Sequence, residues 1–377
     1  MRYFLSPRCL LKRLEIPAVY SIPRDELYEL DEPAFAFLRT CAGTEGCDDA
    51  GCDREFIEYA LSEGILTEEY HAGKRPSIRE AGSPSLRYLE LQITRRCNLR
   101  CRHCYLGPPE DVELSVPAIK RIFAEFEEMQ GLRLLITGGE PLLYREFPAL
   151  NELLPGYAFR KVLFTNGLLL GEETMGSLAV DEIQVSIDGL EAGHDALRGK
   201  GTYRKAIGAV ELALARDFQV SVSTMVHAAN LDEFEGLEAL LKGMGIKDWT
   251  VDIPCGEGNL KVDRMLQPGP EIAGQYLRYG FGAGLHGGGE GFACGLHLAS
   301  VTADGKVAKC TFYSHRPAGT IDEGLEACWR KIVPLGLGEL SCDCDARNLC
   351  RGGCRYRAEL LGDPLGKDYY RCAAFNV

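Results

Sequence analysis

The sequence lacks any apolar run of about 18 residues, the length that a membrane-spanning helix needs. Arg, Lys and Pro interrupt the short apolar stretches of the first seventeen residues, which is not the pattern of a signal peptide. Excess positive charge is also missing, because the formal net charge is −13. We therefore expect a cytoplasmic protein with no nucleic-acid or membrane partner bound through simple electrostatics.

Cysteine, by contrast, is abundant, with 16 residues in the chain. The cytoplasm keeps thiols reduced, so disulfides do not explain so many cysteines, and metal ligation is the economical explanation. The chain has 377 residues, of which 46 % are hydrophobic and 26 % charged. It is therefore long enough for two or three domains with ordinary soluble cores.

The middle of the chain alternates apolar strand patterns with helical ones. The predicted strands are Tyr88–Ile93, Leu132–Thr137, Lys161–Thr165, Glu182–Ile187, Val220–Val226 and Asp248–Ile253. One helix is predicted after Ser115, which can cap it, with Pro117 in its first turn. This alternation indicates parallel pairing through right-handed crossovers. Six units close most of a barrel, but not a full TIM barrel of eight, and ligands of such folds bind at the C-terminal strand ends.

Three cysteines, Cys97, Cys101 and Cys104, follow directly after the first predicted strand. A [4Fe–4S] cluster ordinarily takes four thiolates, so three would leave one iron open for a small molecule. The C-x3-C-x2-C spacing, with His103 before the last cysteine, resembles the signature of the radical S-adenosylmethionine (radical SAM) superfamily. The resemblance implies a [4Fe–4S] cluster that binds S-adenosylmethionine (AdoMet) and cleaves it to a 5′-deoxyadenosyl radical. A fragment of a zinc site is the alternative.

Polar residues also follow three further predicted strands. The second strand leads into a motif made of Gly138, Gly139, Glu140 and Pro141. This GGEP resembles the family motif that contacts the amino group of AdoMet. The resemblance also implies that Asn166, Ser186 and Asp188 hydrogen-bond the ribose and carboxylate of AdoMet, and that the backbone at His103 contacts adenine. On their own, the TNG and SIDG segments that hold these polar residues are turn signals.

The C-terminal third has a cysteine spacing that resembles the SPASM extension of radical SAM peptide-modifying enzymes. The resemblance implies two auxiliary [4Fe–4S] clusters. The first would be held by Cys294, Cys310 and Cys354, and the second by Cys342, Cys344, Cys350 and Cys372. One spacing departs from the family, because a single residue separates Cys342 from Cys344 where the family has two. Zinc ribbons are the alternative for this whole end.

Other cysteines have less defined surroundings. Cys255, in the loop after the sixth predicted strand, is either a fourth ligand of the first auxiliary cluster or a free thiol. Without a fourth protein ligand, the open iron of that cluster could bind substrate. Cys328 is expected to pack in the core. A polar interhelical loop carries Cys41, Cys47 and Cys52, either as a small metal site or as scattered cysteines.

Residues 1–80 form a separate predicted unit, because the segment from His71 to Ser85 has the composition of a linker. Three strand patterns, around Cys9–Leu14, Ala18–Ile22 and Glu26–Leu30, precede two helical ones. The arrangement resembles a small winged-helix module, the precursor-recognition element of pathways that make ribosomally synthesised and post-translationally modified peptides (RiPPs). A DNA-binding winged helix is the alternative, but 10 Lys and Arg against 16 Asp and Glu argue against it.

These patterns together predict an α/β protein with three parts. They are a winged-helix element (1–80), a partial (β/α)6 TIM-like barrel (87–285) and a cysteine-rich SPASM domain (286–377). The resemblance implies a radical SAM maturase that abstracts hydrogen from a precursor peptide with a leader and forms a thioether or C–C cross-link. It also implies a flavodoxin- or ferredoxin-type electron donor.

Two alternatives remain open at this point. The same enzyme type could act on a small metabolite such as a tetrapyrrole, or on a folded protein. A non-catalytic iron–sulfur regulator is the second alternative. No acid–base residue can be assigned from the sequence.

Overall fold

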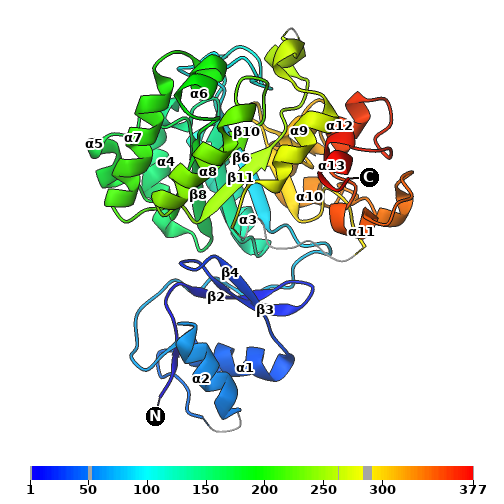
Figure 1. Ribbon diagram of the computed structural model, residues 1–377. Helices are drawn as coiled ribbons and strands as arrows, with labels where there is room; N and C mark the ends of the chain where they lie inside the picture. Colours follow the sequence, from blue (N-terminus) through cyan, green and yellow to red (C-terminus); the bar gives the residue numbers. More distant parts are fainter. Residues whose placement is uncertain (1, 50–52, 262, 283–290, 377) are drawn as a thin grey trace.

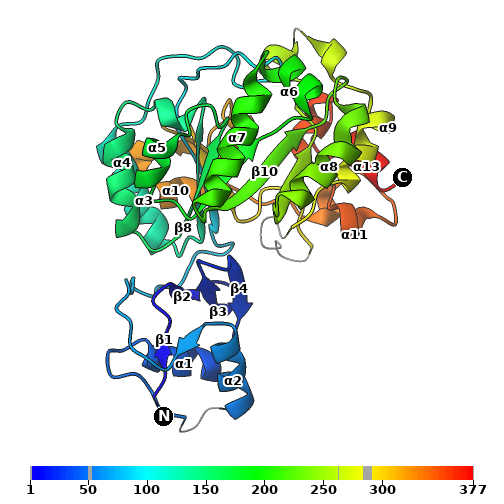
Figure 2. The same cartoon turned by 60° about the vertical axis from the view of Figure 1, so that its left-hand side comes forward.

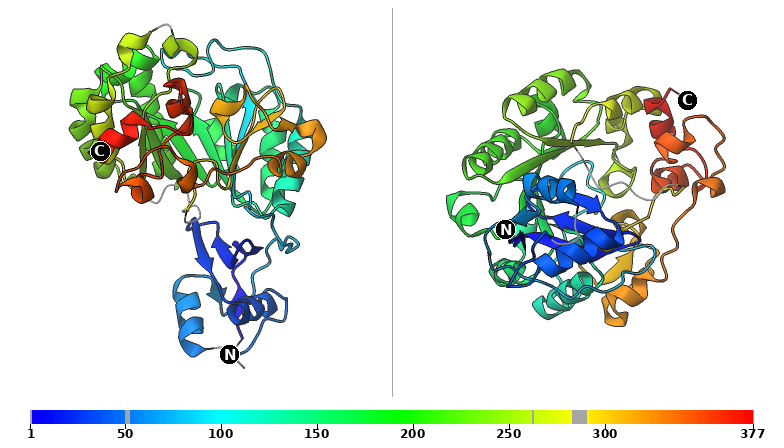
Figure 3. Two further views of the ribbon diagram at one scale, coloured as in Figure 1. Left: turned by 90° about the vertical axis from the view of Figure 1, so that its right-hand side faces the viewer. Right: turned by 90° about the horizontal axis from the view of Figure 1, so that it is seen from below.

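The computed structural model describes residues 2–49, 53–261, 263–282 and 291–376 (Figure 1). A small N-terminal module lies against one end of a larger α/β body, and the cysteine-rich C-terminal region packs on one side of that body (Figures 1 and 3). None of the helices in these ranges has both the length and the apolar character that a membrane span needs.

The parallel strands β6 to β11 lie side by side in sequence order and form the centre of the body. They are β6 (Tyr88–Thr94), β7 (Arg133–Gly138), β8 (Arg160–Thr165), β9 (Glu182–Ser186), β10 (Gln219–Met225) and β11 (Asp248–Asp252). Every predicted strand of this region is confirmed, with each end within one residue of its predicted position. Because β11 does not pair with β6, the described strands form an open, partial barrel, as expected.

Helices cover the outer face of this sheet (Figures 1 and 2). They are α3 (Val116–Glu128), α4 (Phe147–Leu153), α5 (Glu172–Ser177), α6 (Glu191–Arg198), α7 (Thr202–Ala215) and α8 (Phe234–Gly243). Helix α3 begins as predicted, because Ser115 Oγ accepts a hydrogen bond from the amide of Ala118 at 3.4 Å, and Pro117 lies in the first turn.

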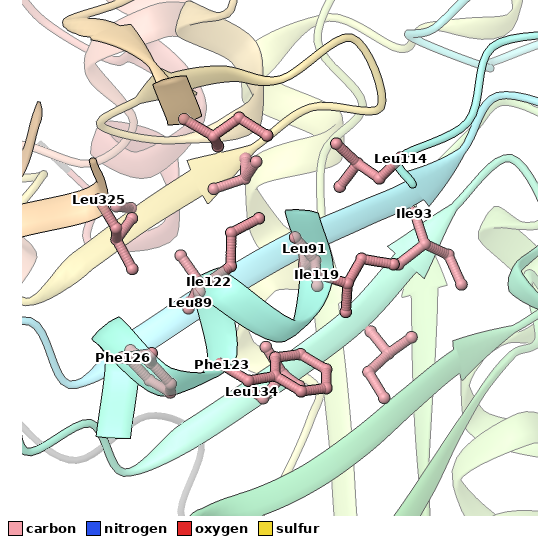
Figure 4. Packing of buried hydrophobic residues seen from close by; sticks show 14 of the residues in the cluster. Leu89, Leu91, Ile93, Leu114, Ile119, Ile122, Phe123, Phe126, Leu134 and Leu325 are labelled. Carbon is pink, nitrogen blue, oxygen red and sulfur yellow. The ribbon is translucent and has the colours of Figure 1, made fainter. Parts of the chain in front are cut away.

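The buried face of α3 explains why apolar residues alternate with a polar one along β6. Ile119, Ile122, Phe123 and Phe126 pack against outward-facing residues of the sheet, among them Leu89 and Leu91 (Figure 4). Successive side chains of a strand point to opposite faces. The side chain of Glu90, between Leu89 and Leu91, therefore points to the inside of the barrel.

The sheet continues past β6 with strands that the sequence did not predict. Strand β12 (Leu298–Val301) pairs in parallel with β6, and β13 (Lys306–Ala308) and β14 (Gly319–Thr320) follow in antiparallel order. The remaining helices of the C-terminal half are α9 (Pro270–Ala273), α10 (Leu325–Trp329), α11 (Arg347–Cys350), α12 (Arg355–Leu360) and α13 (Tyr369–Ala374). The cysteine-rich region thus shares a sheet with the barrel.

The N-terminal module contains the three strands that the sequence predicted. Its elements are β1 (Phe4–Leu5), β2 (Cys9–Arg13), β3 (Pro17–Ser21), β4 (Glu26–Glu29), α1 (Glu32–Cys41), α2 (Arg54–Ser62) and β5 (Leu66–Thr67). One face of the β2–β3–β4 sheet, with Leu11 and Val19, packs on the helices of the module. The other face, with Leu10 and Tyr20, packs on Leu132 of the barrel.

The cysteines of the interhelical loop of the module differ from the prediction. Cys41 and Cys47 form a disulfide, whereas the sequence predicted reduced thiols, as a small metal site or as scattered cysteines. The two residues meet because Cys47 pairs with Tyr3 through two backbone hydrogen bonds of 2.8 and 2.9 Å, which brings the loop back to the end of α1. Cys52 lies outside the described residues. Cys328 is buried in the core, as expected.

A buried charge cluster joins the module to the N-terminal ends of the barrel strands. Asp25 accepts hydrogen bonds from Arg133 Nε at 2.7 Å and from the hydroxyl of Tyr20 at 2.5 Å. Arg160 Nε lies 3.3 Å from the same carboxylate, and its Nη2 lies 2.7 Å from Glu182. Arg133 and Arg160 are the first residues of β7 and β8. Asp25 therefore balances Arg133 and shares Arg160 with Glu182, and the interface removes both guanidinium groups from water.

A buried lysine makes a second connection across the same interface. Lys12 is fully buried and donates to the carbonyl of Gly131 at 2.9 Å. Burial lowers the pKa of its ammonium group to about 8. These contacts hold the module at the end of the barrel opposite to the C-terminal strand ends.

The Asp25→Asn substitution tests this interface. Asparagine tolerates the left-handed backbone of Asp25 (φ 59°) but removes the charge. Arg133 is then left without its counterion, and Arg160 keeps Glu182 alone. We expect the free energy of unfolding to fall by about 3 kcal/mol and proteolysis of the 71–85 linker to accelerate. The matched control is Glu29→Gln, an exposed carboxylate at the end of β4. An unchanged urea midpoint and cleavage rate would contradict the assignment.

Candidate active site

The loop that carries Cys97, Cys101 and Cys104 is held in place by the GGEP segment. The amide of Gly139 donates to the carbonyl of Thr94 at 2.8 Å, and the amide of Glu140 donates to that of Arg96 at 2.8 Å. A Cβ atom on Gly138 or Gly139 would lie less than 3.0 Å from these carbonyl groups. The two glycines are therefore required by the close approach of two backbone segments, in addition to any approach of a ligand.

Glu140 connects two strand ends and does not face the barrel interior. Its carboxylate accepts hydrogen bonds from the hydroxyl of Thr165 at 2.8 Å, the amide of Asn166 at 2.9 Å and the amide of Leu142 at 3.2 Å. The side chain is fully buried, and this burial raises the pKa of its carboxyl group. Glu140 thus fixes the end of β8 against the end of β7.

A cavity of about 380 Å³ lies inside the barrel at these strand ends, a size suited to a small-molecule ligand. The described residues in its wall include most of the predicted cofactor residues: Cys97, Cys101, Cys104, His103, Gly138, Gly139, Asn166 and Ser186. Glu140, Pro141 and Asp188 are buried behind this wall and do not line the cavity. Burial lowers the pKa of His103 to about 3, so its imidazole is neutral.

Asp188 forms an ion pair with Arg198, a cavity residue that the sequence did not predict. Its carboxylate pairs with Nε of Arg198 and accepts the amide of Met225 at 2.7 Å. Burial favours the neutral acid, but Arg198 outweighs this effect and holds the pKa of Asp188 well below its ordinary value. Arg198, in the last turn of α6, lines the cavity and brings a positive charge to it. The one available signal was an arginine ten residues after a strand-end aspartate.

A second loop supports the three cysteines from the other side. The amide of Asn259 donates to the carbonyl of Cys104 at 3.0 Å, and its side-chain amide donates to the carbonyl of Cys101 at 2.8 Å. Gly258 has a φ of +55°, and a Cβ atom there would collide with the carbonyl of Cys104. No sequence pattern indicated this contact, because it joins residues more than 150 positions apart.

The structure brings Cys255 together with the three cysteines assigned to the first auxiliary cluster. The thiol of Cys255 hydrogen-bonds that of Cys354. Burial raises the pKa of Cys294, and the neighbouring Cys354 raises it further. The pKa of Cys310 is likewise raised by burial and then by Cys294. Four cysteines therefore converge, which fits the usual ligand number of a [4Fe–4S] cluster.

The second predicted auxiliary set is only partly assembled. Burial raises the pKa of Cys372, and the nearby Cys350 and Cys344 add to this shift, which places these three together. Cys342 instead lies in an apolar cluster with Ala293, Leu337 and Leu340. The shortened spacing before Cys344 thus coincides with a cysteine that packs in a different environment.

No three His, Cys, Asp or Glu side chains in the described ranges lie close enough to hold a single metal ion. A four-iron cluster distributes its thiolates over separate irons, so the wider spacing of these cysteine groups fits such a cluster.

Comparison with known proteins bears on the same residues. Residues 91–241 match the model of the radical SAM superfamily, and this range contains the three cysteines, GGEP and most of the cavity wall. This stretch of the chain carries a radical SAM domain. Family members use a [4Fe–4S] cluster together with AdoMet, and the donor set of the cavity fits both groups.

Curated radical SAM relatives and solved structures extend the likeness. The mycofactocin maturase MftC of Mycolicibacterium smegmatis is 29 % identical over 74 % of this chain and 80 % of its own length. An AdoMet-dependent heme synthase of Oleidesulfovibrio alaskensis is also 29 % identical, but over only 48 % of this chain and 49 % of its own. SuiB of Streptococcus suis, solved with its precursor peptide SuiA, has a TM-score of 0.66 at 16 % identity and covers 99 % of this chain. AdoMet-bound anSMEcpe has a TM-score of 0.60 at 19 % identity over 77 % of the chain. The predicted α/β partial-barrel fold is thereby confirmed.

The Gly139→Ala substitution tests the clamp on the cysteine loop. The added methyl group would meet the carbonyl of Arg96, so the loop has to move and the three thiolates lose their common geometry. We expect the reconstituted protein to lose about four irons per chain, the content of one cluster, and to stop binding AdoMet in equilibrium dialysis. Gly156→Ala is the matched control, since nothing lies within 4 Å of its added Cβ. Wild-type iron content in Gly139→Ala would show that the clamp is not required.

Proposed function

We propose that this chain is a radical SAM maturase that modifies a ribosomally made precursor peptide. The observation that carries the proposal is the cavity whose wall combines Cys97, Cys101 and Cys104 with Gly139 and Arg198. When bound, the cluster and AdoMet supply a 5′-deoxyadenosyl radical, which abstracts a hydrogen atom from an unactivated C–H bond.

The residues of the chain have distinct tasks in this reaction. The three cysteines hold the cluster and leave one iron open for AdoMet. Gly138 and Gly139 keep the cysteine loop against the strand ends, and Arg198 provides a cation for the carboxylate of AdoMet. Asn166 and Ser186, in the wall, are placed to hydrogen-bond the polar groups of the cofactor.

A peptide substrate is favoured by two independent likenesses. A relative that matches this chain over 80 % of its own length, MftC, is named as a maturase. The fold match with SuiB, a protein solved with a precursor peptide, extends over 99 % of this chain and therefore includes the N-terminal module. The relatives named as heme synthases match about half of this chain. An Fe-coproporphyrin III synthase of Methanosarcina barkeri matches 74 % of it, but at 22 % identity against the 29 % of MftC, which makes a tetrapyrrole the weaker candidate.

The N-terminal module offers a site for the leader of such a peptide. Strand β4 pairs with β3 on one side, and no described strand covers its other side. The rings of Tyr28 on β4 and Tyr59 on α2 lie 6.4 Å apart beside this open edge. An extended peptide can add to a sheet edge through backbone hydrogen bonds while neighbouring side chains select its residues.

The auxiliary cysteines would hold clusters that accept an electron from the substrate. We assign the first cluster to Cys255, Cys294, Cys310 and Cys354, and the second to Cys344, Cys350 and Cys372, with Cys342 added only if its segment shifts. The product is a thioether or C–C cross-link. The external electron donor is a flavodoxin or ferredoxin.

The triple variant Cys97→Ala, Cys101→Ala, Cys104→Ala tests the cofactor assignment. Without the three thiolates, the reconstituted and reduced protein should form no 5′-deoxyadenosine from AdoMet, as measured by chromatography. Iron should fall by about four per chain while the auxiliary clusters remain. Cys328→Ala, a buried core cysteine, is the control and should keep both iron and activity. AdoMet cleavage by the triple variant would overturn the assignment.

The Tyr59→Asp substitution tests leader recognition. Tyr59 is 50 % exposed beside the open edge of β4. The bound leader would bury the introduced Asp carboxylate against an apolar anchor residue, which weakens binding. We expect the Kd of a labelled precursor, identified from a short reading frame beside the gene, to rise about tenfold in fluorescence anisotropy. AdoMet cleavage without peptide should not change.

The control for this substitution is Tyr70→Asp. Tyr70 is equally exposed, at 49 %, but its ring packs against Phe4 on β1. Equal loss of peptide affinity in both variants would place the leader elsewhere than at β4.

A further inference from the structure

Glu90 is a carboxylate in the cavity wall without a cationic partner among the described residues. It lies on β6, four residues before the end of the strand at Thr94. Its neighbours Leu89 and Leu91 belong to the outer core, so its side chain points into the barrel. The position is therefore deep in the cavity and on the β6 side of it.

The surroundings of Glu90 connect the cavity to the first auxiliary cysteine group. The carboxylate accepts the backbone amide of Thr311, which directly follows Cys310. The hydroxyl of Thr311 is in turn 3.0 Å from that of Tyr105, the residue after Cys104. After burial, the charge of Glu90 contributes to the raised pKa of Tyr105, and it also contributes to that of Cys310 after burial and Cys294.

The other carboxylate of the cavity wall has a different environment. Asp252 is paired with Arg357, whose Nη1 lies 2.8 Å from its Oδ1. Arg357 in turn bonds Asp368 at 2.9 Å. Asp252 is therefore committed to an ion-pair network, whereas a single backbone amide is the polar partner of Glu90 that the structure provides.

A carboxylate that faces the cavity with so little compensation is unfavourable, because one backbone amide is its polar partner and no cation offsets its charge among the described residues. An apolar side chain at this position would avoid this unfavourable desolvation. A carboxylate that faces a ligand cavity without a cation can accept a proton from a ligand held there.

We propose that Glu90 is the catalytic base that takes up the proton which the substrate releases as its new bond forms. The inference rests on the proposed maturase function. Formation of one cross-link removes two hydrogens from the peptide. The first leaves as a hydrogen atom and ends in a C–H bond of 5′-deoxyadenosine. The second leaves as a proton, which Glu90 binds, while the remaining electron passes to an oxidised iron–sulfur cluster at the first auxiliary site.

The location of Glu90 explains why this carboxylate and not another would serve. Its hydrogen bond to Thr311 places it one residue from Cys310, an assigned ligand of the electron-accepting cluster. The proton and the electron therefore leave the substrate toward the same wall of the cavity. Negative charge that arrives at the cluster is balanced by the proton that arrives at Glu90.

The test is the Glu90→Gln substitution in the fully reconstituted enzyme with a precursor peptide deuterated in its core. Glutamine can still accept the amide of Thr311 but cannot take a proton at neutral pH. We expect deuterium to appear in 5′-deoxyadenosine at the wild-type rate and the peptide Kd to stay unchanged. The ratio of cross-linked product to 5′-deoxyadenosine should fall about 100-fold or more. Glu90→Asp, which keeps the carboxylate, should restore part of that ratio.

A carboxylate outside the cavity provides the matched control. Asp304 pairs with Lys306 in the turn between β12 and β13, and Asp304→Asn should keep the wild-type ratio. A Glu90→Gln variant that forms product at the wild-type ratio overturns the inference but leaves the proposed function intact. A wild-type chain that cleaves AdoMet but modifies no precursor overturns the proposed function and the inference with it.

Discussion

The backbone hydrogen bonds from Gly139 and Glu140 to Thr94 and Arg96 are the contacts on which the active site depends. They fix the loop that starts where β6 ends, and this loop carries all three cysteines of the AdoMet cluster. Because amides and carbonyls meet directly, no side chain fits between the two segments, which explains both glycines. The buried carboxylate of Glu140 extends the same connection to Thr165 and Asn166 on the next strand.

Charge is distributed very unevenly between the two ends of the barrel. At the N-terminal strand ends, Asp25 and Glu182 neutralise Arg133 and Arg160, and these groups lie at the interface with the module. At the C-terminal ends, Arg198 faces the cavity from its ion pair with Asp188, while Glu90 faces it without a cation. The charges at the N-terminal strand ends are thus used in a domain contact. Those at the C-terminal strand ends face the cavity, where they can bind a ligand or a proton.

Much of this organisation could be predicted from the sequence, and the misses have physical causes. Strands and caps are local patterns, so β6 to β11 and the Ser115 cap were recovered almost to the residue. The cysteine spacings are also local, and the loop with Cys97, Cys101 and Cys104 lies at the cavity. Asp188 was predicted to contact AdoMet, but tertiary packing places Arg198 in front of it. The pairing of β12 with β6 and the contact of Asn259 with Cys101 join distant segments, so no short pattern could reveal them.

The position of the N-terminal module has a consequence for the dimensions of a precursor. A leader on β4 would lie at the strand ends opposite the cavity, and β6 alone, with seven residues at about 3.3 Å each, is about 23 Å long. An extended chain advances at most about 3.5 Å per residue, and it has to pass around the helices outside the sheet. The segment between a leader bound there and the modified residue would therefore need at least about seven residues. Its length, more than the local sequence of the core, decides which side chain reaches the cavity.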